Sequence, residues 1–325
     1  MLPLALTMGD PAGIGGEIAL AAWRQGGLPP FFLIDDADRL EGAAADLEWE
    51  VRVKRIDDPS QTVPDALCVL HRPLAVPAVP GRPDPANAPA VIAAIDLAVE
   101  LATEGRAAAV VTNPIHKESL YQAGFRFPGH TEYLAHLAEV ERVVMLLACP
   151  ELKVVPVTIH LSLRDAIAGL STLQIIETAR IVDRGLKRDF GIARPRLAVA
   201  GINPHAGEGG ALGREDLDII APAVAALRAE GIDARGPLSA DTMFHAEARA
   251  GYDVALGMYH DQVLIPIKTL DFHGGVNVTL GLPFIRTSPD HGTAFDIAGT
   301  GTARPDSLIS ALRLAAHMAD RRTHG

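Results

Sequence analysis

The chain has 325 residues, more than one ordinary hydrophobic core accommodates, so we expect two domains or lobes. Its hydrophobic content is 48% and its aromatic content only 5%, which is typical of a soluble protein with a core of small aliphatic residues. The net charge of -11 argues against binding to nucleic acid or to an anionic membrane surface, and an anionic substrate would need a local cluster of cations.

Three features predict a cytoplasmic protein. The first nine residues lack a basic leader and pass straight into a glycine-rich turn, which favours a first strand over a signal peptide. No uninterrupted apolar stretch reaches membrane-spanning length. The two cysteines, Cys68 and Cys149, each lie within an apolar run and are expected to be buried, reduced thiols.

Short apolar runs alternate with amphipathic patterns along the chain. The runs predict strands at 2–7, 31–34, 67–70, 107–112, 143–148, 154–159, 197–200, 254–258 and 276–280. Helices are predicted at 90–104, 172–187, 215–230 and 306–319. Strands that alternate with helices form βαβ units, so the predicted fold class is α/β with a mostly parallel sheet.

A glycine-rich turn follows the first predicted strand, at residues 8–17. Free amides at the start of a helix attract phosphate or carboxylate groups. The glycine spacing differs from the dinucleotide-binding fingerprint, and a tight turn without a ligand explains these glycines equally well. The turn is therefore a candidate anion site or a purely structural turn.

A second polar loop follows the strand predicted at 107–112 and leads to Gly129, His130 and Thr131. These residues precede a helical pattern, where a threonine can cap the helix or bind an anion with its hydroxyl and amide. The spacing alone favours the helix cap over the anion site.

Three histidines share one setting, because each follows the carboxyl end of a predicted strand. They are His160, His205 and His260. Open α/β sheets bind ligands at this edge, and three imidazoles on one divalent cation leave positions free for substrate or water. The spacing is not a local metal motif, so separate structural roles are the alternative.

Asp241, Lys268 and Arg286 are further candidates for chemistry. Asp241 lies in a polar turn, where it could equally cap a helix. A solvated helix end is the alternative for Lys268, and a surface ion pair is the alternative for Arg286, whose guanidinium suits phosphate. The chain contains no P-loop, zinc-protease, nucleophile-elbow or paired-cysteine motif, which excludes those classes.

Taken together, five segments resemble the 4-hydroxythreonine-4-phosphate dehydrogenase family of pyridoxal phosphate biosynthesis. They lie at residues 9–15, 129–133, 203–208, 259–262 and 292–296. The segments occur in the expected order over nearly the whole chain. Each is unspecific alone, but the set is specific.

The resemblance implies a two-lobed α/β/α fold like that of isocitrate and isopropylmalate dehydrogenases, with the active site in the cleft between the lobes. One lobe would comprise residues 1–128 and 286–325 and carry the cofactor-binding loop. The other, residues 129–285, would carry the metal ligands and the dimer contacts.

The activity implied is an oxidation and decarboxylation of 4-phosphohydroxy-L-threonine to 3-amino-2-oxopropyl phosphate and carbon dioxide. It would use NAD or NADP and a divalent metal such as Zn2+, Mg2+ or Co2+. The family's metal ligands match His160, His205 and His260, and in the family they come from both subunits of a homodimer.

The remaining site residues are also implied by the resemblance. The substrate-binding positions match His130, Thr131, Lys268, Asn277 and Arg286. Asp241 and Lys268 are the catalytic candidates, with Asp241 assigned to proton transfer or to orienting the substrate amine. The loop that resembles the adenine-binding loop of the related dehydrogenases contains His291, Gly292, Thr293, Ala294 and Asp296.

Two departures leave the substrate open within the family. Gly16 stands where the family often has proline, and residues 113–116 vary at positions that are not uniform in the family. The alternatives are a paralogous dehydrogenase for a phosphorylated four-carbon sugar acid or a carboxylated aromatic cis-dihydrodiol, a metal-dependent hydrolase, and a noncatalytic phosphate-binding module.

Overall fold

The computed structural model describes residues 1–324, which divide into two compact units. The first comprises Met1–Arg142 and Leu282–His324, and the second Val143–Gly281. The sequence prediction divided the chain after residue 128 and before residue 286. Helix α5 (His130–Leu137) accounts for the first difference, because Tyr133 donates a hydrogen bond to Asp96 and packs on Phe125, with ring centroids 4.9 Å apart. His130 and Arg286 therefore belong to the same unit.

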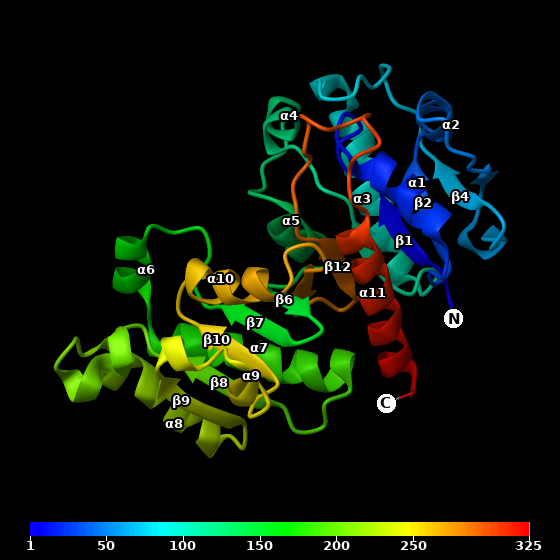
Figure 1. Ribbon diagram of the computed structural model, residues 1–325. Helices are drawn as coiled ribbons and strands as arrows, with labels where there is room; N and C mark the ends of the chain where they lie inside the picture. Colours follow the sequence, from blue (N-terminus) through cyan, green and yellow to red (C-terminus); the bar gives the residue numbers. More distant parts are fainter. Residues whose placement is uncertain (325) are drawn as a thin grey trace. The chain divides into compact units, whose positions relative to one another are not determined.

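The first unit contains a parallel sheet (Figure 1). Its strands are β1 (Leu4–Thr7), β2 (Phe31–Asp35), β3 (Val53–Ile56), β4 (Leu67–His71), β5 (Val110–Thr112) and β12 (Arg286–Pro289). Their spatial order is β3-β4-β2-β1-β5-β12, and every neighbouring pair is parallel. All residues of β1 and β2 are buried, as expected for parallel strands covered by helices.

The helices of the first unit connect or cover these strands. They are α1 (Gly15–Gln25), α2 (Ala37–Asp46), α3 (Ala88–Thr103), α4 (Lys117–Gln122), α5 and α11 (Asp306–His324), with short 3-10 turns η1 (Pro59–Gln61) and η2 (Pro85–Asn87). By length and composition the helical stretch Pro85–Thr103 could cross a membrane. In this unit α3 packs on β1, β2 and β5 and buries Val91 and Ile95, so packing against a sheet explains its apolar character.

The second unit contains a mixed sheet. Its strands are β6 (Val144–Cys149), β7 (Leu152–Pro156), β8 (Arg196–Ala200), β9 (Asp233–Leu238), β10 (Val254–Gly257) and β11 (Val276–Leu280). The order is β11-β6-β7-β10-β8-β9, with β7, β10, β8 and β9 parallel. Strand β6 is antiparallel to both β11 and β7. Only two residues join β6 to β7, and a parallel pair needs a much longer crossover.

Helices and short turns complete the second unit. They are α6 (Leu163–Gly169), α7 (Thr172–Phe190), α8 (Ala221–Ala229), α9 (Ala246–Arg249), α10 (His260–Leu270), η3 (Pro204–Gly210), the π turn η4 (Asp216–Ile220) and η5 (Ala240–Thr242). Helix α10 packs against β7 and inserts Val263 and Ile267 into a core formed with Val154, Ala198 and Ala255.

The predicted α/β class is confirmed, and each predicted strand is present. Among the elements that were not predicted, three have sequences that lack the expected pattern. Strand β12 reads Arg-Thr-Ser-Pro, β9 contains Gly236 and Pro237, and α10 contains Pro266 within an apolar run. The helix predicted at 215–230 begins instead as the π turn η4 before α8.

Candidate active site

A small pocket in the first unit collects cationic side chains at the carboxyl end of β5. It has a volume of about 190 Å³, and its lining includes Thr112, Lys117, His130, Arg286 and His291. Lys117 begins α4 and His130 begins α5. The sequence predicted a local cation cluster in an otherwise acidic chain, and this pocket has that composition.

Arg286 is the most buried cation of this pocket, with 4% of its surface exposed. Its Nη2 donates a hydrogen bond of 2.7 Å to the Thr112 hydroxyl. Burial lowers the pKa of Arg286 to about 10, so the guanidinium stays charged at neutral pH. The charge of Glu132 partly compensates this buried guanidinium, and an anionic ligand beside Arg286 would compensate it further.

His130 faces the same pocket from the first turn of α5, and Thr131 follows it in the helix. The Nε2 atom of His130 is buried and has no hydrogen-bond partner among residues 1–324. Burial lowers the pKa of His130 well below 6.5, and the charges of Arg286 and Lys117 lower it further. The imidazole is therefore neutral at neutral pH, with a ring nitrogen available to a ligand.

The lowered pKa of His130 predicts a pH-dependent stability. Below a pH of about 6.5 the unfolded chain binds a proton at this histidine and the folded chain does not, so the free energy of unfolding must fall as the pH falls. Replacing His130 with asparagine should flatten this dependence in urea titrations. His317→Asn, at an exposed position of α11, should not, and equal slopes for wild type and His130→Asn would contradict the prediction.

The glycine-rich turn is structural, because its amides donate within the protein. The amides of Ala12 and Gly13 donate to Asp10. The amide of Ile14 donates to the Thr293 carbonyl at 3.0 Å. A β-carbon on Gly13 would lie 2.9 Å from that carbonyl, so glycine is needed here. This geometry favours the interpretation as a structural turn over the interpretation as an anion site.

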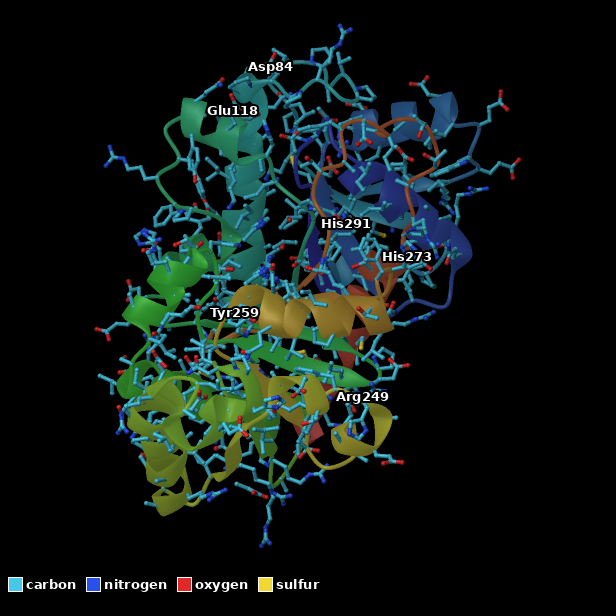
Figure 2. All side chains as sticks on the ribbon, turned by 60° about the vertical axis from the view of Figure 1, so that its left-hand side comes forward. Asp84, Glu118, Arg249, Tyr259, His273 and His291 are labelled. Atoms are coloured by element: carbon cyan, nitrogen blue, oxygen red, sulfur yellow. The ribbon has the colours of Figure 1, made fainter. Side chains whose placement is uncertain are left out.

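The predicted cofactor loop follows β12, and Figure 2 shows His291 at its start. The Nε2 atom of His291 is buried without a partner among the described residues. Beyond Thr293, Ala294 has a left-handed φ of 45°, and Asp296 is exposed.

Glu17, which the sequence analysis did not single out, anchors the far side of this loop. Its buried carboxylate accepts hydrogen bonds from the amides of Gly299 at 2.7 Å and Ala303 at 3.3 Å. Gly299 lies 282 positions beyond Glu17 in the sequence, so no local pattern could have indicated this contact. The loop is thus held at both ends by contacts within the first unit.

The three predicted metal ligands lie in the second unit, beyond the carboxyl ends of adjacent parallel strands. His160 follows β7, His260 follows β10 and His205 follows β8. Since β10 lies between β7 and β8, His260 is the central member of the set. The rings of His160 and His260 have centroids 6.0 Å apart.

The chemistry of His260 suits a metal ligand. Its Nδ1 lies 2.7 Å from a carboxylate oxygen of Asp261. A carboxylate that holds one ring nitrogen fixes the tautomer and directs the lone pair of Nε2 outward, which is the usual arrangement behind a metal-bound histidine. The predicted ligand set therefore fits a divalent cation in its donor type.

The other predicted residues of this unit occupy defined positions. Asp241 is exposed in η5, where the Ser239 hydroxyl and then the charge of His205 lower the pKa of its carboxyl. Lys268 lies in the last turn of α10, the helix that His260 begins. Asn277 lies on β11, and its Oδ1 is buried without a partner among residues 1–324.

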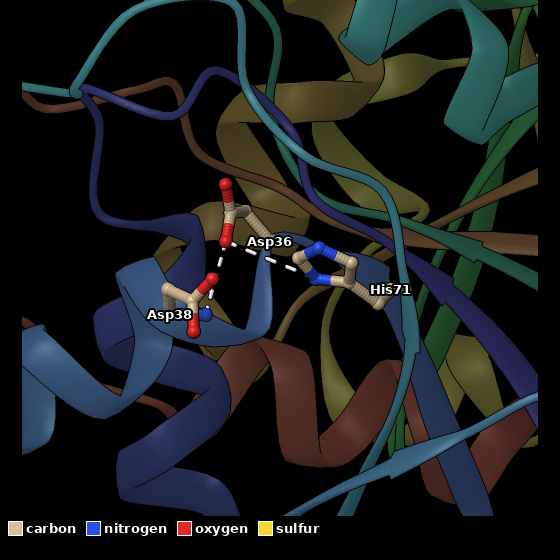
Figure 3. A group of neighbouring side chains, drawn as sticks. All are labelled: Asp36, Asp38 and His71. Atoms are coloured by element: carbon tan, nitrogen blue, oxygen red, sulfur yellow. Dashed lines mark hydrogen bonds and ion pairs between the residues drawn. The ribbon is translucent and has the colours of Figure 1, made fainter.

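Within residues 1–324, one group of three side chains offers one potential ligand atom each, with these atoms within 4.8 Å of one another: Asp36, Asp38 and His71 (Figure 3). The three predicted histidine ligands do not approach one another that closely. Hydrogen bonds explain this group without a metal. Asp36 caps α2 and accepts from the amides of Asp38, Arg39 and Leu74. His71 Nδ1 accepts from the amide of Ala37, and Asp38 pairs with Arg55.

Comparisons with known proteins show which family the chain belongs to. The family model of the pyridoxal phosphate biosynthetic protein PdxA matches residues 28–315. A 4-hydroxythreonine-4-phosphate dehydrogenase from Caulobacter vibrioides is 55% identical over 98% of both chains. One from Methylorubrum populi is 58% identical over 98% of this chain and 95% of its own length.

Solved structures agree with this assignment. The 4-hydroxythreonine-4-phosphate dehydrogenase of Klebsiella pneumoniae has a TM-score of 0.91 at 43% identity, covering 98% of this chain and 100% of its own. A terephthalate 1,2-cis-dihydrodiol dehydrogenase of Burkholderia xenovorans has a TM-score of 0.67 at 33% identity, covering 97% and 98%. The chain therefore belongs to the family of the pyridoxal phosphate biosynthetic protein PdxA.

Proposed function

We propose that this protein is an NAD- or NADP-dependent 4-hydroxythreonine-4-phosphate dehydrogenase of pyridoxal phosphate biosynthesis. It oxidises and decarboxylates 4-phosphohydroxy-L-threonine to 3-amino-2-oxopropyl phosphate and carbon dioxide. The observation that carries the proposal is the buried Arg286 beside the neutral His130, an anion pocket in a chain whose relatives over nearly the full length bear this enzyme's name.

Substrate binding is assigned to His130, Thr131, Lys268, Asn277 and Arg286. Arg286 and the start of α5 suit the phosphate, because a guanidinium pairs with two phosphate oxygens and helix amides attract anions. The unpartnered Oδ1 of Asn277 suits the substrate's ammonium or hydroxyl group.

The reaction balances as follows. The alcohol loses a proton to a base and a hydride to the nicotinamide, which leaves a β-keto acid. The bond to the carboxylate then breaks, carbon dioxide leaves, and the remaining enolate takes up one proton. Asp241 is the candidate acceptor of the first proton, because its carboxylate is ionised at neutral pH and exposed in η5, although its lowered pKa makes it a weaker base. Lys268 is the candidate donor of the last.

A divalent cation held by His160, His205 and His260 would polarise the alcohol and stabilise the enolate charge. Zn2+, Mg2+ and Co2+ are the candidates. The loop at His291, Gly292, Thr293, Ala294 and Asp296 is assigned to the adenosine part of NAD or NADP. The support for this loop is its anchoring through Thr293 and Glu17, which leaves Asp296 exposed to a ligand.

The proposal also includes a cytoplasmic location and a homodimer whose subunits share the metal site. The homodimer is supported by apolar surface on the second unit, where four side chains are 44–60% exposed: Leu161, Leu163, Ile167 and Leu173. Helix α6, which carries two of them, stands out from the rest of that unit in Figure 1. Exposed apolar residues gathered in one stretch of sequence, here residues 161–173, favour a protein interface.

The direct test is nicotinamide reduction with purified protein and added divalent metal. Phosphohydroxythreonine should be turned over faster than a phosphorylated four-carbon sugar acid or a carboxylated cis-dihydrodiol. The relative from Burkholderia xenovorans makes the dihydrodiol the sharper comparison. Preferential turnover of either rival would reassign the substrate, and substrate cleavage without nicotinamide would favour a hydrolase.

Thr112 should affect substrate binding through its hydrogen bond with Arg286. Replacing Thr112 with valine removes the hydroxyl that holds the guanidinium, and we expect KM for the phosphorylated substrate to rise about tenfold or more, the scale of a hydrogen bond to a charged group. Thr112→Ser keeps the hydroxyl and should restore KM. A Thr112→Val enzyme with the KM of the wild type would show that Arg286 holds its position unaided.

A further inference from the structure

A proline-rich strap, residues 72–84, joins β4 to η2 in the first unit. Its four prolines donate no amide hydrogen, and they exclude a helix or a central strand. A cavity of about 470 Å³ adjoins the strap, and its lining also includes residues of α2 and Gly299 at the far side of the cofactor loop. Because a cavity and not a packed core adjoins the strap, individual contacts must set its position.

The tip of the strap is a stiff, tight turn at Pro80 and Gly81. The amide of Arg82 donates a hydrogen bond to the Val79 carbonyl at 3.0 Å, which closes the turn. Proline in the second position and glycine in the third, here with a positive φ of 76°, are typical of a type II turn. Since proline also fixes its own φ, the tip can act as a rigid contact.

This tip contacts both the glycine-rich turn and the cofactor loop. The Gly81 amide donates to the Ala12 carbonyl of the glycine-rich turn at 2.8 Å. A β-carbon on Gly81 would lie 2.8 Å from the Phe295 carbonyl oxygen, so the two backbones are in close contact. A β-carbon on Gly299 would lie 2.8 Å from that of Pro80. The strap thus links the glycine-rich turn to two points of the loop.

Phe295 is held from a second direction as well. Its ring packs edge to face on His116, the residue before α4, with centroids 5.0 Å apart. The next residue, Asp296, is exposed and is one of the residues proposed to bind adenosine. Consecutive α-carbons are about 3.8 Å apart, so the position of Phe295 sets that of Asp296.

The base of the strap is fixed by side chains outside the loop. Asn87, 3% exposed in η2, accepts from the Val76 amide at 3.1 Å and donates to the Val76 carbonyl at 3.0 Å. Asp36, at the start of α2, accepts from the Leu74 amide at 2.9 Å. These bonds determine how far the tip reaches toward the loop.

We propose that the strap positions the cofactor loop for NAD or NADP, with Gly81 as the contact and Asn87 as the residue that sets the strap. This inference rests on the proposed role of the loop in binding adenosine. Gly81 is a positioning residue, because its backbone already contacts Ala12 and Phe295. A loop that is fixed in advance binds more tightly, since less conformational freedom is lost on binding.

The test is the binding of NAD and of NADP to the full-length protein, measured by calorimetry, with KM for phosphohydroxythreonine at saturating nucleotide as a second readout. Gly81→Ala places a methyl group against the Phe295 carbonyl and should displace the loop. If about one tenth of the molecules keep the binding conformation, Kd for the nucleotide rises about 10-fold. KM for phosphohydroxythreonine should not change, because the strap does not line the anion pocket.

Gly105→Ala is the matched control. Gly105 lies in the same unit with a positive φ of 72°, close to the 76° of Gly81, so alanine causes the same backbone strain at both positions. A β-carbon on Gly105 would meet no other part of the described chain within 4 Å. Both variants should lose stability to a similar extent in urea, and only Gly81→Ala should lose nucleotide affinity.

Asn87 provides a second, independent test of the strap. Asn87→Leu makes neither bond to Val76, and Asn87→Asp keeps the acceptor for the Val76 amide. Nucleotide affinity should fall in the order wild type, Asn87→Asp, Asn87→Leu, with KM for phosphohydroxythreonine unchanged. This series tests the strap even if Gly81→Ala fails to fold.

The outcomes are distinguishable. A wild type that binds nucleotide, with Gly81→Ala binding as tightly as Gly105→Ala, overturns this inference and leaves the proposed function intact. Asn87 variants with the Kd of the wild type would also overturn the role of the strap. Equal losses of nucleotide and phosphohydroxythreonine binding would show a general disturbance and contradict the inference. A wild type that binds neither NAD nor NADP overturns the proposed function and this inference together.

Discussion

Replacing Arg286 with methionine will lower kcat/KM for the phosphorylated substrate by about 30-fold or more. Removing one member of a buried charge pair costs about 2–5 kcal/mol, and each 1.4 kcal/mol is about tenfold. Arg286 is 4% exposed and its pKa is lowered to about 10, so little water remains to replace its contact with a bound anion. Steady-state kinetics with varied substrate would measure the effect.

Arg286→Lys should also be impaired, because a lysine keeps the charge but loses the planar two-point contact with phosphate. Arg52→Met is the control, since Arg52 is an exposed arginine of the same unit paired with Asp65. A methionine variant at 286 with unchanged kcat/KM would remove the anion pocket from the active site.

Replacing His260 with alanine will lower the oxidation rate by about 1000-fold or more, because a bound metal contributes several kcal/mol of charge stabilisation. His260 is the central histidine of the three, between the strands that carry His160 and His205. The loss should be accompanied by a lower metal content after dialysis. Nicotinamide reduction and elemental analysis of the same samples would test both.

Replacing Asp261, whose carboxylate contacts the His260 ring, should have a smaller effect than replacing His260 itself. Asp261→Asn should weaken metal binding by about 10-fold to 100-fold, since Asp261 orients the imidazole without binding the metal itself. His317→Ala removes an exposed histidine of α11 and should leave both rate and metal content unchanged. Full activity and metal content in His260→Ala would refute the metal site.

Much of the fold could be predicted because parallel strands are buried on both faces. The continuous apolar runs of β1, β2, β8 and β10 are therefore visible in the sequence itself. The polar residues just beyond those runs, including His205 and His260, could be placed at a strand end for the same reason.

The supporting contacts could not be predicted, because they join residues far apart in the chain. Glu17 contacts Gly299 across 282 positions, Arg286 contacts Thr112 across 174, and Gln262 contacts Gly201 across 61. No periodicity or motif relates such pairs. The glycine-rich turn shows the same limit, since only the contact of Ile14 with Thr293 distinguishes a structural turn from an anion site.

The amino-acid sequence by itself determined the α/β class, the buried strands and the chemical types that follow them, because burial and side-chain chemistry are local properties. Tertiary structure alone decided the order of the strands. Strand β10 pairs with both β7 and β8, although it follows them in the chain, and this order places His260 after the strand that lies between those leading to the other two histidines. Strand order depends on which apolar faces pack best over long distances, and no stretch of sequence carries that information alone.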